Sequence, residues 1–83
     1  MRVLLVDDEA AFARPLAERL ELRGMETGVA LDAEAALVML AEGEWDLVFL
    51  DVGLPGMDGV TLLKILRERY PDLDVVMLSE IGR

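Results

Sequence analysis

The sequence contains no cysteine and no histidine, and it has a single lysine, Lys64. The two absences exclude disulfides, thiol and histidine catalysis, and metal sites built on sulfur or imidazole ligands. Long apolar runs are also missing, because no stretch reaches the roughly 18 consecutive apolar residues of a membrane span. The apolar run after Met1 and Arg2 is too short for the core of a signal peptide. We therefore expect a soluble, cytoplasmic domain that does not enter a membrane.

Positive charge is scarce. Eight Lys and Arg residues face 17 Asp and Glu residues, which gives a formal net charge of −9 and an isoelectric point near 4.2. Because binding to nucleic acid depends on neutralising phosphates with basic side chains, we expect this chain to bind none. Hydrophobic residues make up 54% of the 83 positions, which is enough for one folded domain.

Two short apolar runs end in carboxylates. Residues 3–6 are followed by Asp7, Asp8 and Glu9, and residues 47–50 are followed by Asp51. Such runs are typical of central parallel strands that are buried on both faces. Ligands of open α/β sheets bind at the carboxyl ends of the strands, so these acidic residues lie where a site is expected. Taken singly, each Asp could equally be a helix cap or a solvated loop residue.

If the two strands are neighbours, at least three carboxylates converge at one edge of the sheet. Oxygen ligands without nitrogen or sulfur favour a hard cation such as Mg²⁺ over zinc or copper. Mg²⁺ usually takes one or two carboxylates together with waters and phosphate oxygens. The pattern thus predicts a site that handles phosphate.

The whole chain alternates between predicted strands and helices, which indicates an α/β fold with parallel strands and right-handed crossovers. The predicted strands are residues 3–6, 25–30, 47–50 and 75–78, and the predicted helices are residues 9–23, 33–41 and 59–70. Pro15 predicts a kink or a late start in the first helix. Gly28 predicts an edge position for the second strand.

Three further local predictions concern caps and packing. Asp32 is expected to cap the second helix, and Trp45 to pack at the amino-terminal end of the domain rather than bind a ligand. In the third helix the apolar spacing predicts that Val60, Leu63 and Leu66 face inward, with Leu62 and Tyr70 as further candidates. Lys64 is expected to lie on the solvated side of that helix.

These motifs together resemble the receiver domain of two-component response regulators. The resemblance rests on Asp7-Asp8, Asp51, the Leu-Pro-Gly-Met-Asp-Gly loop at residues 54–59, and Ser79, and it extends along the chain. It implies a flavodoxin-like, doubly wound parallel sheet with strand order 2-1-3-4. It also implies that residues 1–83 form a receiver-like domain that lacks the fourth helix, the fifth strand and the fifth helix.

The resemblance also implies a role for each site residue. Asp51 would be the phosphoacceptor, and Ser79 would hydrogen-bond the phosphoryl group and couple it to a switch. Asp8, Asp51 and the backbone carbonyl of Gly53 would bind Mg²⁺, with Asp7 acting through water. The donor would be a sensor histidine kinase or a phosphotransfer protein. Such a chain is a phosphorelay signalling module and not an enzyme.

Two features depart from the receiver pattern. Receivers carry a lysine at the end of the fifth strand, and Lys64 on the third helix cannot replace it. Glu80 follows Ser79, where receivers usually have a small residue. Both departures are expected to lower phosphorylation without removing the ligands for Mg²⁺.

These departures leave an alternative function open. An unpaired fourth strand is an apolar edge that can pair with another chain, so we expect a homo-oligomer formed through that edge and the uncovered faces of the sheet. The chain would then be a phosphorylation-defective, receiver-derived oligomerisation or interaction module. A phosphatase with an aspartyl-phosphate intermediate is disfavoured, because it needs an acid two residues after the nucleophile, where this chain has Gly53.

Overall fold

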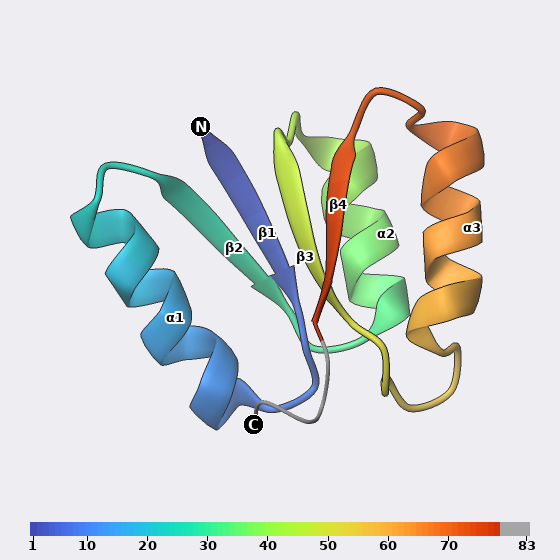
Figure 1. The fold of residues 1–83 in the computed structure, drawn as a ribbon, viewed down its shortest axis with the longest axis horizontal. Helices are drawn as coiled ribbons and strands as arrows, with labels where there is room; N and C mark the ends of the chain where they lie inside the picture. Colours follow the sequence, from blue (N-terminus) through green and yellow to red (C-terminus); the bar gives the residue numbers. More distant parts are fainter. Residues whose placement is uncertain (79–83) are drawn as a thin grey trace.

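The structure, a computed structural model, describes residues 1–78 and contains one parallel sheet flanked by helices. Strands and helices alternate along the chain (Figure 1) in the order β1 (Arg2–Val6), α1 (Ala10–Leu22), β2 (Glu26–Ala30), α2 (Ala33–Glu42), β3 (Leu47–Asp51), α3 (Gly59–Arg69) and β4 (Asp74–Leu78). The strand order in space is β2-β1-β3-β4, and every pairing is parallel. The predicted fold class, strand order and edge position of the second strand are confirmed.

The helices cover both faces of the sheet. Helix α1 lies on one face, and α2 and α3 lie on the other (Figure 1). Alternate residues of β1 divide between the two layers: Leu4 and Val6 pack with the α2 and α3 side, while Val3 and Leu5 pack with α1. All four are at most 2% exposed, as expected of a central strand. Among residues 1–78, no helix is long and apolar enough to cross a membrane.

Two predictions about the helices need correction. Helix α1 does not start late, because it begins at Ala10 and contains Pro15, while a kink at Pro15 stays a prediction. The ring of Pro15 removes the hydrogen bond to the carbonyl of Ala11, and both residues are exposed, so water can solvate that carbonyl. In α3, the inward position is wrong for Val60, which is 51% exposed, and is confirmed for Leu66. Leu62 is also buried, four residues from Leu66 on the face toward the sheet, and Leu63 is partly buried against the same core.

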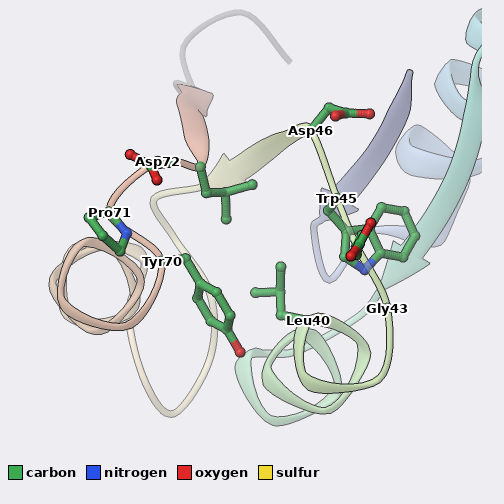
Figure 2. A pocket seen from close by; sticks show the side chains of 9 residues that line it. Leu40, Gly43, Trp45, Asp46, Tyr70, Pro71 and Asp72 are labelled. Atoms are coloured by element: carbon green, nitrogen blue, oxygen red, sulfur yellow. The ribbon is translucent and has the colours of Figure 1, made fainter.

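The amino-terminal edge of the sheet carries an open cavity of about 470 Å³ (Figure 2). It lies between the ends of α2 and α3, and Leu40 and Tyr70 point into it from these two helices. The carboxyl ends of the strands lie at the opposite edge, so this cavity is separate from the acidic strand ends.

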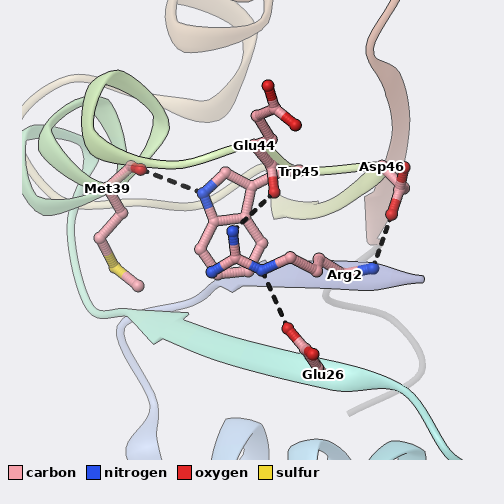
Figure 3. A network of polar contacts seen from close by, with 6 residues as sticks. All are labelled: Arg2, Glu26, Met39, Glu44, Trp45 and Asp46. Atoms are coloured by element: carbon pink, nitrogen blue, oxygen red, sulfur yellow. Dashed lines mark hydrogen bonds and ion pairs between the residues drawn. The ribbon is translucent and has the colours of Figure 1, made fainter.

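Trp45 packs at this amino-terminal edge, as predicted. Its indole N–H donates a 3.0 Å hydrogen bond to the carbonyl of Met39 (Figure 3). A Cβ atom at Gly28 would lie 2.6 Å from the indole and 2.7 Å from the Met39 methyl group. The close approach of Trp45 therefore favours glycine at position 28 in β2. This reason is separate from the edge position of the strand.

Arg2 holds the same edge together through four neighbours. Its guanidinium lies 4.4 Å from the centre of the Trp45 ring and donates a 2.9 Å hydrogen bond to the Glu44 carbonyl (Figure 3). Its Nε lies 3.2 Å from the Glu26 carboxylate, an ion pair whose N–H direction is not that of a hydrogen bond. Its backbone N–H donates to the Asp46 carboxylate at 2.7 Å. Arg2 thus ties the starts of β1, β2 and β3 together.

Candidate functional site

Three carboxylates meet at the carboxyl edge of the sheet. Val6 in β1 pairs with Leu50 in β3, so the residues that follow them, Asp7 and Asp51, lie side by side at the ends of these two strands. One carboxylate oxygen each from Asp7, Asp8 and Asp51 can be chosen so that all three lie within 4.8 Å of one another. The structure therefore brings together the three acidic residues that the sequence analysis placed at one site.

Burial separates the three residues. Asp51 is 0% exposed and Asp7 is 2% exposed, and they are the only polar residues in the buried set within residues 1–78. Asp8 is exposed. Asp7 and Asp51 thus form the floor of the cluster, and Asp8 faces solvent.

A local hydrogen bond orients each buried carboxylate. The backbone N–H of Glu9 donates to Oδ1 of Asp7 at 2.9 Å, and that of Gly53 donates to Oδ1 of Asp51 at 3.1 Å. In both cases the donor lies two residues after the acceptor, as in an Asx turn. The two Oδ2 atoms are themselves buried. The turn that follows each strand therefore fixes its carboxylate.

The donor set fits a hard divalent cation. All three side chains offer carboxylate oxygens, and one of them faces solvent, which leaves room for the water ligands that Mg²⁺ retains. Nitrogen and sulfur ligands are absent because the chain has no His and no Cys. A cation here would also offset the repulsion between carboxylates held this close together.

The loop after Asp51 is anchored by residues that the sequence analysis left out of the site. Leu54 is only 5% exposed and packs into the core, which pins the loop to the body of the domain. Gly56 has a φ of +74°, a conformation that favours glycine. The Leu-Pro-Gly sequence signalled a turn, but the burial of Leu54 depends on tertiary packing.

Gly59, the first residue of α3, packs directly on the backbone of the acidic strand end. A Cβ atom there would lie 2.7 Å from the Cα of Val52 and would also collide with the carbonyl oxygen of Asp51. The backbone N–H of Gly59 donates to the Val52 carbonyl at 3.3 Å. From the sequence, Gly59 is predicted only to start the helix. In the structure, the absence of a side chain at Gly59 also sets how closely α3 approaches Asp51.

Asp58 lies outside the cluster and caps α3. Its carboxylate accepts a 2.8 Å hydrogen bond from the backbone N–H of Thr61. This bond is the main reason that the pKa of Asp58 lies below its ordinary value of 3.8, and Lys64 adds a smaller effect of its charge. Asp32 caps α2 in the same way, accepting from Ala35 N–H at 2.7 Å, as predicted.

Gly53 lies in the loop directly after Asp51, and its carbonyl stays a predicted ligand. Ser79 and Glu80 lie outside the described residues. Lys64 is exposed on α3, as predicted.

Comparison with known protein families decides the ancestry of this arrangement. The family model described as the response regulator receiver domain matches residues 3–83. The chain belongs to this family. Receiver domains of response regulators are phosphorelay signalling modules, bind Mg²⁺ at an acidic Asp cluster and interact with histidine kinases or phosphotransfer proteins.

Curated response regulators resemble this receiver domain closely in sequence. The response regulator protein FleR of Pseudomonas aeruginosa is 44% identical over 81 residues, covering 98% of this chain and 17% of FleR. The two-component response regulator PhoP of the same organism is 37% identical over 82 residues, covering 99% of this chain and 36% of PhoP. The chain thus spans about one sixth to one third of the length of these two relatives.

Solved receiver structures share the fold. A receiver domain of a Francisella response regulator superposes with a TM-score of 0.88 at 33% identity, covering 99% of this chain and 68% of that one. The response regulator TrrA of Thermotoga maritima, solved in complex with Mg²⁺ and BeF, gives a TM-score of 0.88 at 35% identity, covering 94% of this chain and 68% of that one.

Proposed function

We propose that this receiver domain accepts a phosphoryl group on Asp51 in a Mg²⁺-dependent phosphorelay. One observation carries the proposal: a fully buried carboxylate at the end of β3 lies within 4.8 Å of two further carboxylates from the neighbouring strand end. The phosphoryl donor would be a phosphohistidine of a sensor histidine kinase or of a phosphotransfer protein. Membership of the family supports this choice of partner.

In this proposal Asp51 is the nucleophile. One of its carboxylate oxygens forms a bond to phosphorus as the phosphorus–nitrogen bond of the donor phosphohistidine breaks, and the imidazole leaves. The product is an acyl phosphate on Asp51. The hydrogen bond from Gly53 N–H to Oδ1 orients the carboxylate for this attack.

Mg²⁺ would be held by Asp8, Asp51 and the carbonyl of Gly53, with Asp7 acting through water. When bound, Mg²⁺ supplies charge neutralisation for the approaching phosphoryl group. The buried position of Asp7 beside the exposed Asp8 supports this division of roles. Ser79 is proposed to hydrogen-bond the phosphoryl oxygens. The chain would thus act as a signalling domain rather than an enzyme, and we place it in the cytoplasm.

The intact mass of the chain tests this function. The chain is incubated with a small-molecule phosphodonor and Mg²⁺, and parallel samples contain EDTA or the Asp51→Asn variant. We expect one phosphoryl adduct on the original chain and none in either parallel sample. Asp46→Asn is the matched control, because it removes a carboxylate at the opposite edge. An adduct that persists in Asp51→Asn would contradict the proposal.

We also propose that the 83-residue chain self-associates through β4. Strand β4 has one neighbour, β3, among the described residues, and its Val76 is 43% exposed. A free apolar strand edge favours pairing with a second chain. Light scattering is expected to give a mass above that of one chain. A single-chain mass together with cooperative unfolding would contradict self-association. A self-associated chain that forms no adduct would favour the alternative, a phosphorylation-defective interaction module.

A further inference from the structure

The cavity at the amino-terminal edge of the sheet has a lining suited to a ligand with an apolar stem and a positive end. We propose that it binds an arginine side chain presented by a partner protein. The cavity of about 470 Å³ is large enough for one long side chain. It is separate from the carboxylate cluster, so this inference does not rest on the proposed phosphorelay function.

The walls of the cavity are apolar and aromatic. Leu40 from α2, Leu73 from the turn before β4, Tyr70 at the end of α3, and Trp45 before β3 contribute to the lining. Figure 2 shows Leu40 and Tyr70 projecting into the space between the two helices. Such walls suit the methylene stem of a long basic side chain. The planar guanidinium of arginine also stacks on aromatic rings better than the ammonium of lysine does, which favours arginine.

All charged residues in the lining are acidic. Glu44, Asp46 and Asp72 are exposed residues of the lining, and Figure 2 shows Asp46 and Asp72 on opposite sides of the group of lining side chains. Within residues 1–78, the side chains of Glu44 and Asp72 make no hydrogen bond or ion pair. These two carboxylates are therefore available to a cation from outside.

The ends of two helices add to the negative potential. Helix α2 ends at Glu42 and helix α3 at Arg69, and the residues that follow them, Gly43 and Tyr70, both line the cavity. The carbonyl ends of helices attract cations. The dipole of α2 thus acts in the same direction as the three carboxylates. The last turn of α3 carries Arg67 and Arg69, which offset the dipole of that helix but do not line the cavity.

Arg2, which lies near the cavity, already has interaction partners of its own. Arg2 is held by Glu26, by the Glu44 carbonyl and by the Trp45 ring, and it is not among the residues that line the cavity. The cavity therefore offers negative charge that no side chain of its own lining neutralises. This charge complementarity selects a basic partner.

Trp45 provides a direct test because it is the chain's single tryptophan. The probe is the peptide acetyl-Gly-Arg-Gly-amide, and its control contains citrulline, a neutral side chain of the same shape, in place of arginine. Binding to the 83-residue chain is followed by the NMR shift of the Trp45 indole N–H. We expect saturable shifts, with the arginine peptide binding about fivefold more tightly, the upper value for one exposed ion pair.

Charge variants locate the binding. Glu44→Gln combined with Asp72→Asn should lower the affinity of the arginine peptide to that of the citrulline peptide. Glu18→Gln combined with Glu34→Gln removes the same charge from exposed positions outside the cavity and should leave the affinity unchanged. Equal binding of the two peptides, or no saturable shift with either, would overturn the proposal. A dilution-dependent indole shift without peptide that the Glu44→Gln and Asp72→Asn variant abolishes would also overturn it, by indicating a second copy of this chain in the cavity.

Discussion

At the scale of single residues, burial distinguishes carboxylates that are alike in the sequence. Asp7 and Asp8 are adjacent, yet Asp7 is 2% exposed and Asp8 is exposed. The reason is the strand geometry, since successive side chains leave a strand end in different directions. A solvent-facing carboxylate above a buried one gives a cation direct access to Asp8.

Removal of Asp8 should therefore weaken Mg²⁺ binding strongly. We expect Asp8→Asn to lower the affinity for Mg²⁺ by about tenfold or more, because loss of even an outer-shell partner of a metal ligand costs at least about tenfold. Isothermal titration calorimetry measures the affinity. Asp72→Asn, which removes an exposed carboxylate at the other edge, serves as the control. Equal affinities of Asp8→Asn and the original chain would exclude Asp8 as a ligand.

Asp58 should give the stability of the domain a defined pH dependence. Its pKa is lowered in the folded state, chiefly by the hydrogen bond from Thr61, so its stabilising contribution is present above its unfolded pKa near 3.8. That contribution is lost as the pH falls through the lower, folded pKa. Asp58→Asn keeps an acceptor for the helix cap and removes the titration.

Urea unfolding between about pH 6 and pH 2 tests this expectation. The difference in unfolding free energy between the original chain and Asp58→Asn should shrink as the pH falls below about 4. Asp74→Asn, a change at another exposed Asp, is the matched control variant. A difference that stays constant over the whole pH range would contradict the role of the Thr61 hydrogen bond.

At the scale of elements, the junction between the loop after Asp51 and α3 depends on Gly59. Replacement of glycine by alanine usually favours a helix. Here Gly59→Ala would place a methyl group against the backbone of Asp51 and Val52. We expect a destabilisation of about 1–3 kcal/mol, typical of overpacking, together with weaker Mg²⁺ binding, because the loop must move.

Gly24→Ala separates this effect from general backbone strain. Gly24 has a φ of +87°, and a Cβ atom there would have no neighbour within 4 Å. This variant should also lose stability, as a consequence of its backbone conformation, but it should bind Mg²⁺ normally. Unfolding in urea and calorimetry supply both quantities. Normal Mg²⁺ binding by Gly59→Ala would show that the junction does not position Asp51.

The same elements show which features could be predicted from the sequence. Apolar runs that end in Asp located β1 and β3, and Asp32 located the start of α2, because strand burial and helix caps are local signals. The inward face of α3 was less predictable, since Val60 and Leu62 are both apolar and only packing selects Leu62. The roles of Gly28 and Gly59 could not be predicted, because Gly28 contacts Trp45, which is distant in the sequence, and Gly59 contacts Val52 across a loop.

At the scale of the whole molecule, the two edges of one sheet carry different chemistry. The carboxyl edge holds buried carboxylates from β1 and β3, and the amino-terminal edge holds an aromatic cavity with an acidic opening. Acidic residues of this chain, whose net charge is −9, thus gather at both of these edges. Part of this charge forms the carboxylate cluster that we propose as a cation and phosphoryl site, and part of it lines the separate cavity that we propose for a basic partner.

The central claim is that Asp51, and not its acidic neighbours, takes the phosphoryl group. Reductive trapping tests it most directly: borohydride converts an aspartyl phosphate into homoserine, and peptide mass mapping then locates the change. After incubation with a phosphodonor and Mg²⁺, we predict homoserine at position 51 and unchanged Asp at positions 7 and 8. Homoserine at position 7 or 8, or at none of the three positions, would contradict the account.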